Sequence, residues 1–262
     1  MKKKIVVIGG TGLVGSRVVE NLSRQGFEAV AAAPSTGVNT ITGEGLAEVL
    51  DGATTVVDLS NSPSYEESAV RDFFANSTSN LLKYEAAANV KHHVVLSIVG
   101  MEGLPDSYYF RAKIAQENLI KESPIPYTIV RSTQFMEFVK GIADAATDGD
   151  TVRIAPVRFQ PIAANDASKI VAEVAAGEPV NGTIEIAGPE QFQMDELIRR
   201  GLIARGDTRS VVADPAARYF GAELRETSLV PDGDARFGET RFEDWLANAG
   251  DSKSASHAAG PK

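Results

Sequence analysis

Short apolar segments alternate with longer mixed segments along the first half of the chain. The apolar segments are rich in β-branched residues and predict strands at 5–8, 28–33, 54–59, 93–98 and 127–131, with a shorter strand at 38–41. The segments between them predict helices over 16–22, 44–50, 66–88 and 107–122. Because the strand segments are apolar at nearly every position, both faces of the sheet are expected to be buried. The pattern predicts an α/β fold with a doubly wound parallel sheet.

Beyond residue 134 the alternation becomes looser. A turn is expected at 148–150, a strand at 183–187, a helix from Asp195, and irregular structure from Ala235 onward. We therefore predict one domain over residues 1–248, with a small C-terminal lobe formed mainly by about 135–245. Residues 249–262 are small and polar, and we expect a disordered tail there.

The composition removes several functional classes. The chain has 262 residues, of which 43% are hydrophobic, and carries a formal net charge of −9, with no basic run longer than Lys2, Lys3 and Lys4. Nucleic acid and anionic membranes are therefore unexpected partners. The absence of cysteine excludes disulfides, thiolate metal sites and cysteine nucleophiles. No segment approaches the length of a membrane span, and we expect a cytoplasmic protein.

A histidine metal site is also unexpected. His92 and His93 are adjacent on a predicted strand and would face opposite sides of the sheet. Because only His257 remains besides them, no metal is predicted.

A glycine-rich turn connects the first strand to the first helix. Gly10-x-Gly12-x-x-Gly15 matches the dinucleotide fingerprint, and Gly9-x-x-Gly12-x-x-Gly15 matches its close variant. The first glycine forms the turn, the middle one admits a pyrophosphate, and the last lets helix and strand pack closely. Free amides and the helix dipole then hold the phosphates. The cofactor-binding residues predicted from this loop are Gly9, Thr11, Gly12, Leu13, Val14 and Gly15.

A candidate catalytic group follows on the helix over 107–122. Tyr109 and Lys113 are four residues apart and share one helical face, while Ser97 ends the preceding strand. In a doubly wound sheet, ligands bind at that end of the strands. Carbonyl reduction by hydride needs a proton donor and a hydrogen-bond donor at the substrate oxygen. We predict that Tyr109 donates the proton, Lys113 lowers the tyrosine pKa and binds the ribose, and Ser97 holds the oxygen.

The type of dinucleotide is predicted from the end of the second strand. An NAD site usually has an acidic residue there, but residues 31–34 contain no carboxylate. Ser35, Thr36 and the backbone of Gly37 could accept a 2′-phosphate, but the loop has no arginine, so a positive charge is missing unless Arg17 or another residue reaches across. These residues favour NADP(H), with NAD(H) as the alternative.

Together, the glycine loop, Ser97 and Tyr109-x-x-x-Lys113 resemble the short-chain dehydrogenase/reductase superfamily. Asn80-Leu81-Leu82 and the segment 127–135 resemble its atypical, NmrA-like branch. The resemblance implies a Rossmann fold and places Ser60 and Asn61 near the ribose and nicotinamide. It also implies that Thr133, Gln134 and Phe135 border the nicotinamide and the substrate. Tyr108 and Phe138 are further candidates for an apolar substrate pocket, although aromatics at such places often belong to the core.

The chain departs from the family pattern at one position. Many relatives have an asparagine after the fourth strand that completes a proton relay, and alignment on Asn80-Leu81-Leu82 puts Phe74 near that place. Many NmrA-like members have also lost Tyr-x-x-x-Lys and act as redox sensors, whereas this chain retains it. The sequence therefore favours an NADP(H)-dependent reductase of a small, mostly apolar ketone or aldehyde. A non-catalytic NAD(P) sensor and a quinone or imine reductase are the alternatives, and the oligomeric state is left open.

Overall fold

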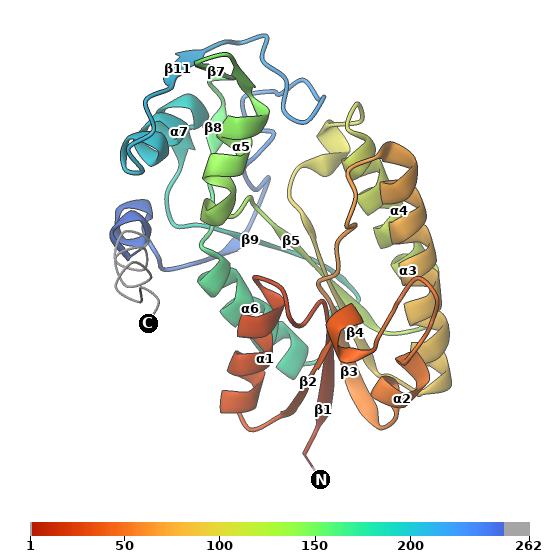
Figure 1. The fold of residues 1–262 in the computed structure, drawn as a ribbon. Helices are drawn as coiled ribbons and strands as arrows, with labels where there is room; N and C mark the ends of the chain where they lie inside the picture. Colours follow the sequence, from red (N-terminus) through yellow and green to blue (C-terminus); the bar gives the residue numbers. More distant parts are fainter. Residues whose placement is uncertain (1, 249–262) are drawn as a thin grey trace, which may run out of the picture.

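A single parallel sheet of seven strands forms the centre of the protein (Figure 1). The computed structural model describes residues 2–248, so the tail predicted at 249–262 lies outside the described residues. The strands of this sheet are β1 (Lys4–Ile8), β2 (Glu28–Ala32), β3 (Ala53–Asp58), β4 (His92–Ile98), β5 (Tyr127–Ser132), β9 (Gly182–Ala187) and β12 (Ala235–Phe237). Their order is β12-β9-β5-β4-β3-β1-β2. This arrangement confirms the predicted doubly wound sheet of the Rossmann type.

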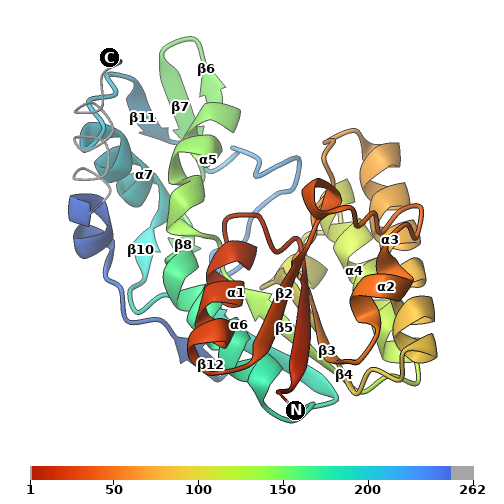
Figure 2. The same cartoon turned by 60° about the horizontal axis from the view of Figure 1, so that its bottom comes forward.

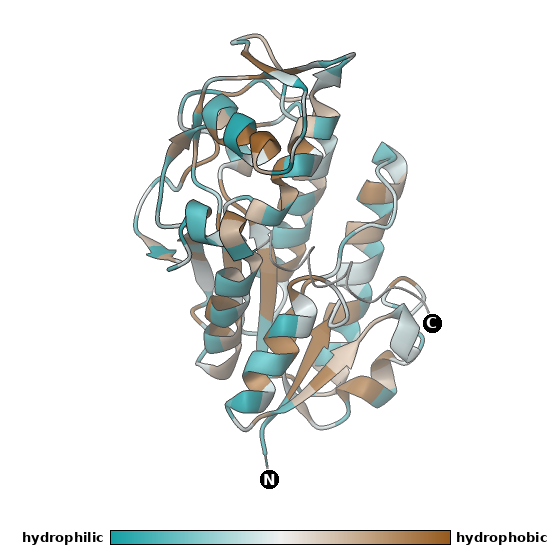
Figure 3. Ribbon diagram, turned by 60° about the vertical axis from the view of Figure 1, so that its left-hand side comes forward, coloured by the Kyte–Doolittle hydropathy of each residue, from teal (hydrophilic) through white to brown (hydrophobic). Residues whose placement is uncertain are grey.

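Helices cover both faces of the sheet (Figure 2). One layer contains α1 (Gly15–Arg24) and α6 (Ala164–Ala176); the other contains α2 (Leu46–Leu50), α3 (Glu67–Ala87) and α4 (Tyr108–Glu122). The side chains of β1 alternate between the two layers. Ile5 and Val7 pack in the cluster beneath α1 and α6, while Val6 and Ile8 pack in a cluster on the opposite face. Burial on both faces explains why the central strands are largely apolar, and Figure 3 shows them mostly in brown.

A smaller group of elements lies above the carboxyl ends of the strands (Figure 1). It contains a three-stranded sheet in the order β11-β7-β6 and a two-stranded sheet of β10 and β8. Residues 135–245 are shared between this group and the central layers, because α6, β9 and β12 belong to the latter. The elements of the smaller group are α5 (Val139–Ala145), β6 (Thr147–Asp148), β7 (Thr151–Ile154), β8 (Arg158–Phe159), β10 (Phe192–Gln193), α7 (Met194–Ile203) and β11 (Ser210–Ala213). Short 3₁₀ turns occur elsewhere in the chain; they are η1 (Pro34–Thr36), η2 (Met101–Gly103) and η3 (Met136–Phe138).

Two predictions about local structure are wrong. Residues 38–41 form a loop, not a strand, because polar contacts from α3 hold them: Ser77 donates to the Thr40 hydroxyl, and Asn80 donates to the Thr40 and Ile41 carbonyls. The segment from Ala235 is not irregular, because β12 pairs in parallel with β9 and residues 242–248 are helical. Both outcomes depend on partners far away in the sequence.

The turn after β1 is too crowded for side chains. Gly9 has a φ of +71°, a conformation that favours glycine. A Cβ on Gly10 would lie 2.6 Å from the Val7 carbonyl oxygen and 2.7 Å from the Ala31 Cα. Backbone therefore packs directly on backbone where β1, β2 and the loop meet, and this contact fixes the direction in which α1 begins.

This packing predicts that Gly10→Ala destabilises the fold. Both neighbouring atoms belong to the backbone, so the added methyl group overpacks a rigid contact and should cost about 1–3 kcal/mol. Urea unfolding would measure the loss. Gly103→Ala is the matched control, since a Cβ there meets nothing within 4 Å; equal losses in the two variants would contradict the prediction.

Candidate active site

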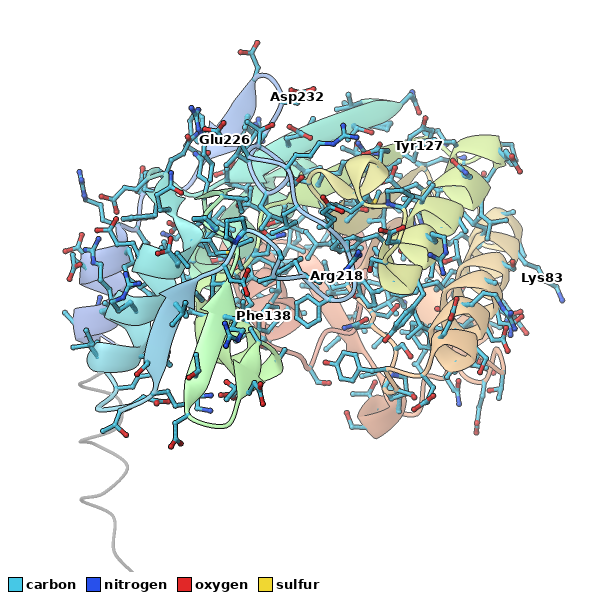
Figure 4. All side chains as sticks on the ribbon, turned by 90° about the horizontal axis from the view of Figure 1, so that it is seen from above. Lys83, Tyr127, Phe138, Arg218, Glu226 and Asp232 are labelled. Atoms are coloured by element: carbon cyan, nitrogen blue, oxygen red, sulfur yellow. The ribbon has the colours of Figure 1, made fainter. Side chains whose placement is uncertain are left out.

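A cavity of about 1270 Å³ opens at the carboxyl ends of the central strands. Strand order reverses between β1 and β3, and doubly wound sheets bind ligands in the crevice at that point. The glycine loop, the ends of β3, β4 and β5, and the start of α4 contribute to its wall. Figure 4 looks down on this end, with Phe138 and Arg218 near the middle of the view. The cavity thus lies between the central sheet and the smaller group of elements.

The glycine loop forms one wall and has the shape that a pyrophosphate requires. A Cβ on Gly15 would lie 2.1 Å from the Gly9 carbonyl oxygen, so the helix start packs closely on the turn. Gly12 is less constrained, with its nearest neighbour at 3.3 Å. Among residues 2–248, the Leu13 and Val14 amides have no backbone acceptor. Free amides at a helix start in a glycine cradle fit the phosphates of a dinucleotide.

Tyr109 is mostly buried, at the start of α4. Its hydroxyl donates to Asn61 Oδ1 at 2.8 Å, and its ring packs edge-on against Phe74 at 5.8 Å between ring centroids. Burial, with a contribution from Tyr65, raises the pKa of Tyr109 to about 12, against the opposing effect of the Asn61 hydrogen bond. Lys113 is not among the groups that shift this pKa, and the lowering of the pKa by Lys113 stays a prediction. The phenol remains protonated at neutral pH.

Lys113 is buried one helical turn further on. Its ammonium donates to the Leu96 carbonyl oxygen at 2.9 Å and to the Gln116 side chain, and lies 4.8 Å from the centroid of the Phe74 ring. Burial lowers the pKa of Lys113 to about 8, although nearby carboxylates oppose the shift. The structure thus places Phe74 beside both Tyr109 and Lys113, where the relay asparagine was expected.

A polar network that the sequence reading missed continues from Lys113. Gln116 donates to Asp58 Oδ2 at 3.0 Å, and Asp58 Oδ1 accepts from the Ser60 hydroxyl at 2.6 Å. Lys113 and Gln116 are three residues apart on α4, a spacing that could have revealed their contact. The hydrogen bond between Gln116 and Asp58 joins residues 58 positions apart, so no local sequence pattern indicates it.

Ser97 lines the cavity but is directed to other partners. Its hydroxyl lies 3.7 Å from Met101 Sδ and contributes a hydrogen bond to Glu117. Burial opposes ionisation of Glu117, yet hydrogen bonds from Arg131, Ser97 and Lys121 hold its pKa below the ordinary value. Among the described residues, no hydrogen bond connects Ser97 with Tyr109 or Lys113.

The residues after β5 carry unused polar atoms. Thr133 Oγ1 and Gln134 Oε1 are buried and have no hydrogen-bond partner in the described part of the chain. Buried polar atoms usually have a partner, so a ligand in the cavity would satisfy them. Phe135 and Phe138 follow directly, with ring centroids 5.6 Å apart, and both line the cavity.

Most other predicted residues also meet in this cavity. Thr11, Ser60, Asn61 and Tyr108 line it, and the Tyr108 hydroxyl donates to the Tyr65 carbonyl oxygen. Ser35 and Thr36 do not line it. The Thr36 hydroxyl instead accepts from the Ala33 amide at 2.9 Å and closes a turn.

Several lining residues were not found from the sequence. They lie in loops, where no periodic pattern marks them. They come from the segment before α3, the loop before α4 and the loop after β11: Pro63, Tyr65, Asp106, Tyr219, Phe220 and Gly221.

Two further structural findings concern metals and membranes. Within residues 2–248, no three His, Asp or Glu side chains are grouped so that they could hold a metal ion. His92 contacts the Thr128 hydroxyl and His93 contacts Glu85, each at 2.9 Å. In the same part of the chain, no helix is long and apolar enough to cross a membrane.

The fold and the glycine cradle together define a Rossmann protein that binds a dinucleotide. Residues 9–173 match the NAD(P)H-binding family. The chain belongs to this family.

Known relatives are distant. The chain is 23% identical to the photosystem II assembly factor Ycf39 of Synechocystis sp., over 95% of this chain and 77% of that protein. Among solved structures, an Agrobacterium tumefaciens short-chain dehydrogenase/reductase with bound NAD superposes with a TM-score of 0.75 at 16% identity, covering 97% and 98% of the two chains. The Escherichia coli quinone oxidoreductase QOR2 complexed with NADPH gives 0.73 at 17% identity, covering 94% and 99%. These likenesses show the shared fold.

The buried ammonium predicts a pH-dependent stability. Between pH 8 and 10.5 the unfolded chain still binds the Lys113 proton that the folded chain has released, so this group makes stability rise with pH. Relative to Lys113→Met, the wild type should gain on the order of 3 kcal/mol between pH 7 and pH 10.5. Urea unfolding of both proteins at pH 7 and pH 9.5 would detect most of this difference, and a constant difference would contradict it.

Proposed function

We propose that the protein is an NADP(H)-dependent reductase of a small, mostly apolar ketone or aldehyde. The observation that carries this function is the Tyr109 phenol at the cavity beside the glycine loop, with Lys113 one helical turn away. When bound, the reduced nicotinamide supplies a hydride to the carbonyl carbon. Tyr109 gives its proton to the carbonyl oxygen, so the carbonyl becomes an alcohol and the dinucleotide is oxidised. A phenol with a pKa of about 12 is protonated at neutral pH, as a proton donor for reduction must be.

Other residues would orient the reactants. Lys113 and Asn61 line the cavity and would hold the ribose, and the unpartnered polar atoms of Thr133 and Gln134 would bind the nicotinamide side. The smaller group of elements would hold the substrate. Exposed aromatic side chains border this part of the cavity and suit an apolar substrate; they are Tyr65, Phe138 and Phe220.

NADP(H) is the cofactor that the loop after β2 favours. Residues 33–36 carry no carboxylate that would repel a 2′-phosphate. Arg17 extends from the first turn of α1 back to the Leu13 carbonyl oxygen, so its charge lies at the glycine loop.

Two alternatives are each supported by one finding. Ycf39 is named an assembly factor, which favours a non-catalytic dinucleotide sensor that binds a partner protein. The structural likeness to a quinone oxidoreductase, together with the aromatic lining, favours a quinone as the carbonyl substrate.

Tyr109→Phe tests the proposed chemistry. Loss of the phenolic proton should lower NADPH-dependent carbonyl reduction by about 10²–10⁴-fold, while NADPH affinity stays unchanged. A panel of aromatic and aliphatic carbonyl compounds, with a quinone included, would be followed by NADPH absorbance. Tyr127→Phe is the matched control, because Tyr127 begins β5 at the opposite end of the strand from the cavity.

The outcomes separate the three functions. Turnover by the wild type that survives in Tyr109→Phe would remove Tyr109 as the proton donor. Turnover of the quinone alone would favour a quinone reductase, and tight NADPH binding without any turnover would favour the sensor.

Arg17→Ala tests the cofactor preference. If Arg17 contacts the 2′-phosphate, its removal should weaken NADPH binding about tenfold and leave NADH binding nearly unchanged, as expected for one charge-assisted hydrogen bond. Fluorescence titration would measure both affinities. Arg24→Ala, at the other end of α1, is the control, and equal weakening of NADPH and NADH would count against a 2′-phosphate contact.

A further inference from the structure

Tyr219 belongs to the loop after β11 and is held firmly at the cavity. Its amide donates to the Ala222 carbonyl oxygen at 2.8 Å, and the Ala222 amide donates back at 3.0 Å. The two residues between them have positive φ values, +46° at Phe220 and +88° at Gly221. A non-glycine residue rarely adopts this conformation, so the turn is held by its surroundings.

An ion pair holds the same turn to the segment before α4. Arg218 donates to the Gly221 carbonyl oxygen at 3.1 Å and pairs with Asp106 at 3.5 Å. Asp106 precedes α4 and lines the cavity, so this ion pair joins the loop to the segment that leads into Tyr109. Both charges are largely exposed, so the pair contributes more to placement than to stability.

The Tyr219 side chain is almost fully buried, with 8% of its surface exposed, and it lines the cavity. Its ring belongs to the apolar cluster against which Tyr109 packs. Burial is the main cause that raises the pKa of Tyr219, and the nearby Tyr109 phenol raises it further, so the Tyr219 hydroxyl keeps its proton. The hydroxyl is not one of the enclosed, unpartnered polar atoms of residues 2–248, and the residue lines the cavity, so a ligand there can reach it.

Carbonyl reduction builds negative charge on the substrate oxygen, and a donor besides the proton donor stabilises that charge. The Ser97 hydroxyl, which the sequence predicts for this role, contacts Met101 and Glu117. Tyr219 is a second phenol that borders the same cavity as Tyr109.

We propose that the Tyr219 hydroxyl donates a hydrogen bond to the substrate carbonyl oxygen, opposite Tyr109. The oxygen then lies between two neutral phenols, one from α4 and one from the loop after β11. This inference rests on the proposed reductase function, but it concerns oxygen binding and can be tested without hydride transfer.

Tyr219→Phe removes the hydroxyl and keeps the ring. The probe is benzaldehyde labelled with ¹³C at the carbonyl, bound with NADP⁺, in which no hydride is available. Each hydrogen bond lowers the carbonyl stretching frequency, so infrared difference spectra should show a large shift in wild type and a smaller one in Tyr219→Phe. Turnover of benzaldehyde by NADPH should fall by about 100-fold in Tyr219→Phe, the loss typical of one such donor. Tyr127→Phe should match wild type in both measurements.

A structural role would give a different result. Since the proposed partner of the hydroxyl is the substrate, Tyr219→Phe should unfold in urea at the same or a higher midpoint and bind NADPH normally. An unchanged carbonyl shift in Tyr219→Phe, or no shift in wild type, would overturn the inference. If the shift depends on Tyr219 but wild type oxidises no NADPH with any carbonyl compound, the oxygen-binding role stands and the reductase function fails.

Discussion

The site depends on one buried positive charge. The ammonium of Lys113 is taken out of water at the junction of α3, α4, β3 and β4, and its desolvation is offset by groups from each of them. Leu96 supplies a carbonyl oxygen, Gln116 an amide oxygen, and Phe74 a ring face. Gln116 in turn is tied to Asp58. Holding this charge therefore places α4, and Tyr109 with it, against the ends of β3 and β4.

The surroundings of Lys113 and Tyr109 shift the two pKa values in related ways. Burial lowers the pKa of Lys113 and raises that of Tyr109, so each group is driven toward its neutral form. For a tyrosine, the neutral form is the proton donor. A bound dinucleotide would add its own groups to this site, whereas the chain alone already provides a protonated phenol at the cavity.

Much of the fold could be predicted from the sequence because the signals are local. The buried strands and the glycine turn at Gly9–Gly15 are read from a few neighbouring residues, and so is the shared face of Tyr109 and Lys113. The missed features depend on distant partners: the loop at 38–41 is held by Ser77 and Asn80, and β12 exists because β9 has a free edge. Tyr219 lies in a loop whose path no periodicity marks, and the direction of the Ser97 hydroxyl depends on Met101 and Glu117.

Phe74 has a consequence for the supply of protons. Its ring covers the side of Tyr109 that faces α3, where a polar relay would otherwise lead away from the phenol. The hydrogen-bond partner of that phenol is the Asn61 carboxamide oxygen, which has no proton to release. In the proposed reduction, the phenolate left after proton transfer would therefore take its next proton from water that enters the cavity. Departure of the alcohol and entry of water would then complete each turnover.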